Sequence, residues 1–386
     1  KIVVEAWIYK PSEYEKNEER EEEMNKSPKV SHIQLRGLLV SAVIGVGILS
    51  IPNALASSMG SDGWVAIIAG GLIMIPILLI YNKIFMLYPG MDIFEIGKAT
   101  LGTFVFTIIM LVYFSFFLVA LAVVTRHLEE LVKIFLLQTT PLEVIILTFI
   151  ITTSYIATHE IDIIARAGYF VYPIIISFAF IIFLIALPGA EFDNVLPVFQ
   201  FSSMDLLKGI KDVSFSFMGI ELIIFAIPYV EDKENVVKSG VIGIAVVTII
   251  YVVIFIMTLS HFSLAQMDRH VYPVLMLIRQ LDLPGFFLEN LDGLIMALWV
   301  IVVFATVAPA YYGAGKVLSK LFKTKSHKYF IWALIPVIYY IALIPKNYIQ
   351  LVEGLGHIHD ILAAFTIVLF PLLILIVGSI RKKVGR

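Results

Sequence analysis

Two apolar stretches of this 386-residue chain carry residues that interrupt helices and could bind a small molecule. The first holds Gly45 and Gly47, with Pro52 five residues after the second glycine. Glycine weakens a helix interior by about 1 kcal/mol, and proline removes a backbone donor. Inside a membrane, freed N–H and C=O groups must be buried in protein or line a cavity. The stretch predicts two half-helices around a break, although such glycines also occur where helices simply pack closely.

The second stretch combines a helix break with an ionisable side chain. Gly219 lies near its middle, Glu221 follows two residues later, and Pro228 comes nine residues after the glycine. A charged group at mid-membrane costs about 2.5–3.5 kcal/mol, so Glu221 must face a cavity or a partner. It could bind freed backbone N–H groups or take part in proton coupling. The alternative is an uncharged glutamate that only braces the first stretch.

The composition places these stretches in a membrane protein. Hydrophobic residues make up 60% of the chain and charged residues 15%, and the apolar runs are long enough for spanning helices. The net charge of −2 gives no reason to expect a nucleic-acid partner. The chain has no cysteine, and His357 and His359 have no further metal ligands nearby in the sequence. We therefore expect no enzyme activity, no metal site and no cofactor.

Apolar runs predict an all-α protein with ten transmembrane helices. We expect an acidic, disordered tail over residues 1–30 and a membrane domain over 31–386. Residues 267–282 carry several charges and predict an amphipathic connection rather than a span. The expected spans are 33–57, 63–87, 104–124, 142–157, 163–187, 206–229, 240–263, 287–313, 329–345 and 358–379.

The two interrupted spans occupy corresponding positions, first and sixth. This pattern predicts an inverted repeat of two five-helix halves, over about 31–187 and 203–380, with a binding site at the breaks. Half-helix N-termini would attract a carboxylate, and carbonyl groups or Glu221 would attract an ammonium group. The expected ligand is a small zwitterion.

Lysine and arginine residues predict the orientation. With the N-terminus inside, the inner segments hold 17 of these residues and the outer segments 7, when the four in residues 1–23 are left out. Cytoplasmic loops carry the excess of positive charge. We therefore expect a multi-pass membrane protein with both termini in the cytoplasm.

The break motifs resemble those of a known transporter superfamily. The pattern Gly45-x-Gly47-Ile48-Leu49-x-x-Pro52, with Gly219-x-Glu221, is similar to the amino acid–polyamine–organocation superfamily. More narrowly, the chain resembles the spore germination permease family, the B subunits of endospore germinant receptors. Ser31-His32-Ile33-Gln34 and Tyr88-Pro89-Gly90 support the narrower resemblance.

This resemblance implies a leucine-transporter-like fold and a sensing function. Members bind a nutrient in the spore inner membrane and act with a receptor A subunit and a lipoprotein C subunit. The implied function is a sensing subunit for a small amino acid, surrounded by membrane lipids. The alternative is a proton-coupled amino acid permease that acts alone.

The resemblance also implies site residues by position. We expect the backbone amides of Gly45 and Gly47, rather than their small size, to be what the protein uses. The aromatic residues could instead be ordinary core, and Thr306 could bond only its own helix. The implied ligand-binding residues are Gly45, Val46, Gly47 and Ile48 for the carboxylate, Phe217, Met218, Gly219, Ile220 and Glu221 for the ammonium group and side chain, and Tyr113, Phe117 and Thr306 as walls.

Overall fold

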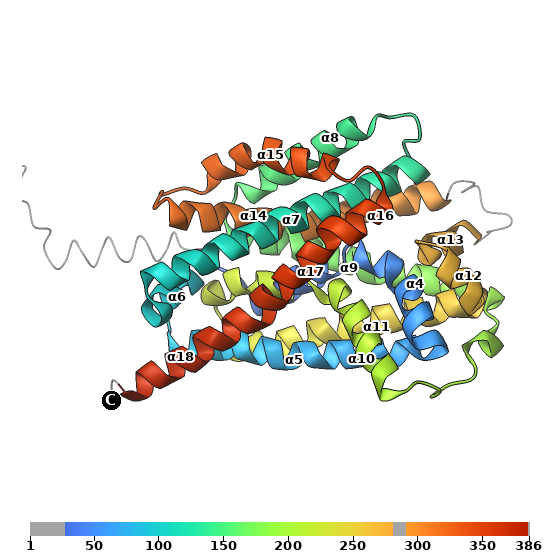
Figure 1. Cartoon of the computed structure of the whole chain (residues 1–386), viewed down its shortest axis with the longest axis horizontal. Coiled ribbons are helices and arrows are strands. Elements are labelled where there is room, and N and C mark those ends of the chain that lie inside the picture. Colours follow the sequence, from blue (N-terminus) through green and yellow to red (C-terminus); the bar gives the residue numbers. More distant parts are fainter. Residues whose placement is uncertain (1–27, 281–290, 385–386) are drawn as a thin grey trace, which may run out of the picture.

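Helices form almost all of the regular structure in residues 28–280 and 291–384, the part that the computed structural model describes. They lie roughly along one long axis in Figure 1. Most of the predicted tail, the end of the predicted connection and the start of the predicted eighth span lie outside the described residues. The all-α prediction is confirmed for the described part of the chain.

The first half of the chain forms one broken helix followed by four continuous ones, with one additional short helix between the first two of these. Ser31 starts the first helix with a capping box, because its hydroxyl accepts from the Gln34 N–H and its own N–H donates to the Gln34 side chain. The elements are α3 (His32–Val43), α4 (Gly47–Met59), α5 (Gly63–Leu87), α6 (Ile93–Leu101), α7 (Thr103–Phe135), α8 (Leu142–Ala157) and α9 (Ile161–Ala186).

The second half repeats this order. A helix is again interrupted, and the helices that follow have lengths close to their counterparts: 26 residues in α11 against 25 in α5, 31 in α14 against 33 in α7, and 16 in both α15 and α8. The elements are α10 (Ser203–Ser214), the 3₁₀ turns η4 (Phe215–Phe217), η5 (Ile220–Phe225) and η6 (Ile227–Tyr229), α11 (Val236–His261), α12 (Leu264–Arg269), α13 (Pro273–Gln280), α14 (Leu291–Leu321), α15 (Lys328–Leu343) and a continuous run from α16 (Tyr348–Gln350) through α17 (His357–Ala363) to α18 (Phe370–Val384).

Six helical stretches in the described residues are long and apolar enough to cross a membrane. They correspond to the second, third, fifth, seventh, eighth and tenth predicted spans, and the first of them also includes α4. α8 and α15, at the fourth and ninth positions, are apolar but shorter. α3 and α10 are only 12 residues long because the chain breaks after them. The number of ten crossings stays a prediction.

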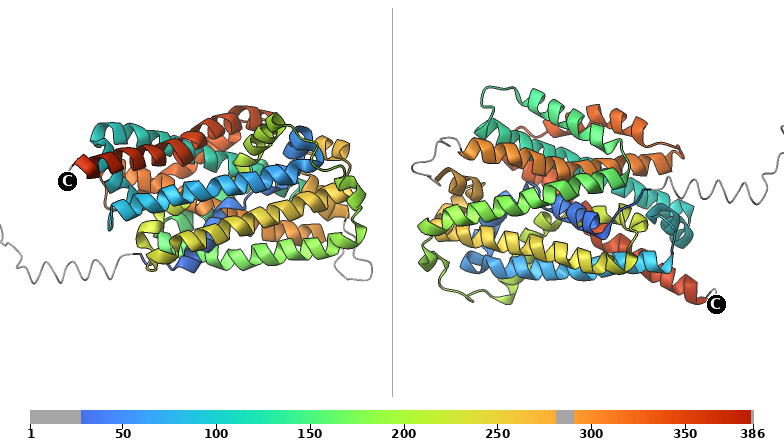
Figure 2. Two further views of the ribbon diagram at one scale, coloured as in Figure 1. Left: turned by 90° about the horizontal axis from the view of Figure 1, so that it is seen from below. Right: turned by 180° about the vertical axis from the view of Figure 1, so that it is seen from behind.

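The interrupted backbone lies inside the bundle, where α3 is largely buried and η5 is buried throughout. α3 packs against α9, α11 and α14, and α10 packs against α4 and α5. α5 and α11 run side by side, as Figures 1 and 2 both show. The interrupted backbone is therefore covered by intact helices, as a membrane requires.

Three predicted boundaries differ from the structure. The third span does not end at 124, because α7 continues to Phe135 and carries Arg126 within ion-pair distance of Glu129 and Glu130. The tenth span does not begin at 358, because the helical run starts at Tyr348. The short helix α6 was not expected, although Asp92 and Glu95 form its capping box. The first two boundaries were misplaced because charged residues lie within these helices. Hydropathy alone cannot distinguish a charged pair buried in a helix from charged residues in a loop.

Val30 belongs to the folded domain and not to the predicted tail. It is fully buried and pairs with Val230: its N–H donates to Tyr229 O over 3.0 Å, and its carbonyl accepts from Glu231 N over 3.1 Å. The C-terminal end of α18 lies at α6, where the Arg381 side chain donates to Ala99 O. We call the end of the bundle that holds α6 the α6 end.

Candidate binding site

The first break separates α3 from α4 by three residues. Ile44 has an extended conformation, and the Gly45 N–H donates to Val43 O instead of continuing the helical pattern. The first N–H groups of α4, beginning at Gly47, have no acceptors within the helix. Pro52 lies inside α4 and does not interrupt it. The glycines therefore coincide with the break and the proline does not.

Side-chain hydroxyl groups from two other helices donate to the carbonyl groups that the first break frees. On α14, the Thr306 hydroxyl lies 2.8 Å from Ser41 O, 3.2 Å from Ile44 O and 3.3 Å from Val302 O of its own helix. On α11, the Tyr251 hydroxyl lies 3.1 Å from Val43 O. Thr306 therefore does more than bond its own helix, because it joins α14 to the broken segment.

The second break begins where α10 ends at Ser214 and lasts until Tyr229, with only 3₁₀ turns between. Gly219 has a φ of 107°, which L side chains rarely adopt, and its N–H donates to Glu221 Oε2 over 2.9 Å. The same Tyr251 hydroxyl lies 2.7 Å from Ser216 O. Tyr251 thus stands between the two breaks and contacts a freed carbonyl of each.

The breaks also touch directly. A Cβ atom built on Gly219 would come within 2.4 Å of Ala42 O, the last turn of α3. A Cβ on Gly45 would come within 2.9 Å of the Thr306 side chain, and one on Gly47 within 2.9 Å of Ser216. The prediction that size does not matter at Gly45 and Gly47 was therefore wrong, because both positions are tightly packed.

A cavity of about 60 Å³ lies where the breaks meet. On this scale a water molecule occupies about 10–15 Å³, so the cavity accommodates about four to six water-sized groups. This is the size range of the smallest amino acids. The predicted site residues that line it are Gly45, Val46, Gly47, Phe117, Met218, Gly219, Glu221 and Thr306.

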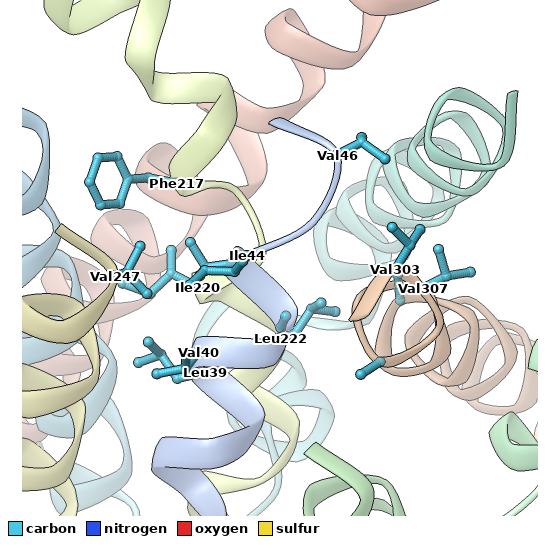
Figure 3. Close-up of a cluster of buried hydrophobic side chains, with 14 of the residues drawn as sticks. Leu39, Val40, Ile44, Val46, Phe217, Ile220, Leu222, Val247, Val303 and Val307 are labelled. Carbon is cyan, nitrogen blue, oxygen red and sulfur yellow. The ribbon is translucent and has the colours of Figure 1, made fainter. Parts of the chain in front are cut away.

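Four predicted site residues do not line this cavity. Ile48 lines a separate small cavity with Phe178 and Trp299. Tyr113 turns away, since its hydroxyl donates to Thr366 O over 2.6 Å. Phe217 packs edge-on against Tyr251. Ile220 belongs, with Ile44 and Val247, to the buried hydrophobic cluster drawn in Figure 3.

The physical reason differs among these four. Tyr113 lies one turn before Phe117 on the same face of α7. It is displaced by about 6 Å along the helix axis, so its hydroxyl reaches the π-helical segment η9 (Ala364–Leu369) instead. Phe217 and Ile220 flank the turn at Met218 and Gly219, where the backbone reverses the direction in which side chains point.

Several lining residues were not expected. Phe116, adjacent to Phe117, faces the cavity as well. His359 of α17 is 3% exposed and also lines it, although the sequence placed it at the start of a span. The predicted span begins at 358, so His359 was expected at a helix end. If the helix start at Tyr348 had been predicted, His359 would have been recognised as a polar residue inside a helix, which is a signal for a functional site. Ala310 was expected beside Thr306 and lines the cavity as well. The other unexpected lining residues are Ala42, Val43, Ala120, Leu121, Val124, Phe215, Ser216, Leu222 and Val307.

The site presents polar groups of both signs within apolar walls. The amide end of α4 favours an anion, and the Glu221 carboxyl group supplies acceptors beside it. Glu221 is 3% exposed. In the described part of the chain, no group of three or more His, Asp or Glu side chains lies close enough to hold a metal ion. The arrangement can receive a small zwitterion.

Residues 29–351 match the sequence model of a family described as "Spore germination protein". Among its relatives, the chain is 29% identical to spore germination protein YndE of Bacillus subtilis, over 92% of this chain and 98% of the relative. It is 25% identical to spore germination protein B2 of the same species, over 94% and 99%. Spore germination protein GerLB of Bacillus cereus is 25% identical, over 89% and 93%.

Solved structures identify the fold. MhsT in complex with L-phenylalanine superposes with a TM-score of 0.66, at 13% identity, over 91% of this chain and 96% of that one. A substrate-bound sodium-coupled sialic acid symporter superposes with a TM-score of 0.63, at 12% identity, over 88% and 79%. The family and the fold are those of multi-pass, transporter-like membrane proteins rather than of enzymes. The chain belongs to the spore germination protein family and has the leucine-transporter-like fold.

Proposed function

We propose that this protein is the nutrient-sensing subunit of a spore germinant receptor and binds a small amino acid in the cavity between its two breaks. The observation that carries the proposal is the cavity itself. Its polar groups come from interrupted backbone and from the side chains of Glu221, Ser216, Thr306 and His359. The rest of its wall is apolar, and its volume of about 60 Å³ suits a small amino acid. The complex of MhsT with L-phenylalanine shows that this fold can hold an amino acid.

The ligand would lie with its carboxylate at the amide end of α4. Positive dipole ends of helices stabilise anions there. The ammonium group would lie near Glu221, whose Oε2 already accepts from Gly219 N. Binding would therefore bring charge to both breaks at once, and a change at either would pass through Tyr251, which contacts both.

The relatives support the wider proposal that the protein works in a receptor complex. We assign it a receptor A subunit and a lipoprotein C subunit as partners, in the spore inner membrane, with both termini in the cytoplasm. Lys98 of α6 and Arg381 of α18, two of the positive residues assigned to the inner segments, lie at the α6 end. The repeats over about 31–187 and 203–380 belong to the same proposal.

A cavity-filling variant tests the ligand site. Ala120→Leu adds side-chain volume to the α7 wall, and we expect amino acid binding to weaken at least about tenfold because the space is already small. Ser115→Leu, at an exposed position of the same helix, is the matched control. Binding of single amino acids to purified protein measures both. Equal binding by the two variants would place the ligand elsewhere.

The transporter-like fold favours one second candidate, a proton-coupled permease. Uptake of a radiolabelled amino acid by vesicles that contain only this chain separates the two functions. A sensor gives binding without accumulation, whereas a permease accumulates the amino acid when a proton gradient is imposed. Glu221→Gln would then abolish the dependence on the gradient, because the side chain can no longer exchange a proton.

A further inference from the structure

His359 lies in the middle of an unusual helical run. Its helix, α17, is preceded by the π-helical segment η8 (Leu351–Gly356) and followed by η9. π-helical turns are uncommon and occur often at functional sites, where they change which side chains face inward. Here they accompany an α17 whose residue 359 faces the cavity, while residues 357 and 358 are exposed.

Two aromatic rings fix the imidazole. Its plane is nearly parallel to the Phe116 ring, with an interplanar angle of 6° and a centroid distance of 5.1 Å. The Phe215 ring meets it edge-on at 5.7 Å. Because Phe116 covers one face of the ring, the polar groups of His359 remain at the ring edge.

Both of those polar atoms lack partners. Within the described residues, Nδ1 and Nε2 of His359 are buried and neither has a hydrogen-bond partner. Buried polar groups in native proteins are almost always hydrogen-bonded, so a group that is not calls for an explanation. Packing alone does not explain it, since a phenylalanine would fill the same stack without leaving polar atoms unpaired.

We infer that His359 is the residue that recognises the side chain of the ligand, and that the preferred ligand is a small amino acid whose side chain is uncharged and forms hydrogen bonds. This inference rests on the proposed function. A neutral imidazole offers one donor and one acceptor, and a hydroxyl group can form a hydrogen bond with either one. The amide end of α4 and Glu221 are already assigned to the carboxylate and ammonium groups.

The walls around His359 restrict the ligand further. Apart from the breaks, its neighbours in the cavity are mostly apolar, including Phe116, Leu121 and Val124. A charged side chain would be desolvated there without a partner of opposite charge. A purely aliphatic side chain would leave both imidazole nitrogens unpaired. Together with the small volume, these conditions favour L-serine first and L-threonine second.

Two pairs of amino acids test this directly. L-serine differs from L-alanine, and L-threonine from L-valine, by little more than a hydroxyl group. We expect the wild-type full-length protein to bind L-serine about tenfold more tightly than L-alanine, and L-threonine more tightly than L-valine, as one hydrogen bond in a desolvated site predicts. Titration calorimetry of the purified protein gives each Kd.

The variants separate recognition from packing. His359→Phe keeps the stack on Phe116 and should bring the serine and alanine affinities to within about twofold of each other, whereas His359→Gln should keep the preference. The control His357→Phe lies two residues away, is exposed and lines a different cleft, so its ligand preference should match wild type.

Distinct outcomes overturn the two proposals. If wild type binds amino acids without preferring the hydroxyl member of either pair, or if His359→Phe lowers all affinities equally, the inference about His359 is wrong and the cavity proposal stands. If wild type binds none of the four amino acids, the proposed function itself fails. The wild-type comparison decides the matter even if His359→Phe does not fold.

Discussion

The two breaks differ in how the backbone groups that they free find hydrogen-bond partners. The first is three residues long, and hydroxyl groups from α14 and α11 donate to its freed carbonyls. The second runs from Phe215 to Tyr229 and is stabilised largely by its own residues: Gly219 in a left-handed conformation, the Glu221 carboxyl group on its N–H, and successive 3₁₀ turns.

This difference indicates which break is easier to rearrange. An element whose hydrogen bonds come from other helices can change its conformation only when those helices move or those hydrogen bonds break. An element with its own internal contacts can shift as a unit. We therefore expect the second break to depend most on its own backbone, and the first break to depend most on Thr306 and Tyr251.

The largest effect is expected from Gly219→Ala. Its φ of 107° is strained for alanine, and the new Cβ would lie 2.4 Å from Ala42 O, a backbone atom that cannot turn aside. We expect a loss of more than about 3 kcal/mol, seen as failure to accumulate folded protein in the membrane. Gly90→Ala is the control, because Gly90 has a φ of 83° with open space around it.

Gly90→Ala should cost only about 1 kcal/mol, the penalty of the left-handed conformation alone. Thermal unfolding in detergent, followed by tryptophan fluorescence, measures both variants. Similar losses at the two positions would mean that contact between the breaks contributes little, and would remove the basis for treating them as one unit.

The next effect concerns the link between the breaks. Tyr251→Phe removes the hydroxyl that lies near both Val43 O and Ser216 O. We expect a loss of about 1–3 kcal/mol because Ser216 O loses this donor, whereas Val43 O keeps the Gly45 N–H. Tyr311→Phe is the matched control, since that buried hydroxyl donates to one carbonyl, Ile331 O, away from the breaks. A smaller loss for Tyr251→Phe than for the control would count against the link.

A smaller effect tests the packing of the first break. Gly45→Ala places a Cβ 2.9 Å from Thr306 Cγ2, and we expect a loss of about 1–2 kcal/mol. Thr306→Ser removes that methyl group and keeps the hydroxyl, so the double variant should recover part of the loss. A double-mutant cycle measures the coupling. Additive losses would show that the methyl group is not what excludes a side chain at Gly45.

Much of this comparison could be predicted from residue types. Gly45 and Gly47 predict the first break, and Gly219 with Glu221 predicts the second, because glycine and a carboxyl group are both unfavourable in a membrane helix without a local reason. The pattern could not show that a residue from another helix completes each break. Tyr251 is one of several hydroxyl-bearing residues in an apolar span, with Thr248 and Thr258 among the others, and nothing in the sequence around it reveals its partners.

The inward-facing side chains were harder to predict for a related reason. Phe116, Phe117 and Tyr113 are all aromatic and share one face of α7, and only their position along the helix relative to the breaks selects the first two. His359 needed the correct start of its helix and the π-helical segments on either side. The selection of the α7 side chains and the placement of His359 both depend on contacts between segments far apart in the sequence. Sequence patterns indicate only the local conformational preference of each segment.

The smallest effect on stability is expected at His327, which precedes α15 and lies outside both breaks. It provides a reference against which the effects at the breaks can be compared. Burial, and then the Lys316 ammonium, lower the pKa of His327 below its ordinary value, while Glu160 and a hydrogen bond to Ala157 O oppose the shift. The unfolded chain therefore binds a proton more readily than the folded one. The resulting stability is complete above a pH of about 6.5 and is lost as the pH falls toward the folded pKa.

Between pH 7.5 and 5.5 we expect a loss of under about 1 kcal/mol in the free energy of unfolding of wild type. His327→Gln should show a shallower dependence of this free energy on pH, and thermal unfolding measures both. Tyr251→Phe, which removes no titrating group in this range, should keep the wild-type slope. An unchanged slope in His327→Gln would assign the pH dependence to another group.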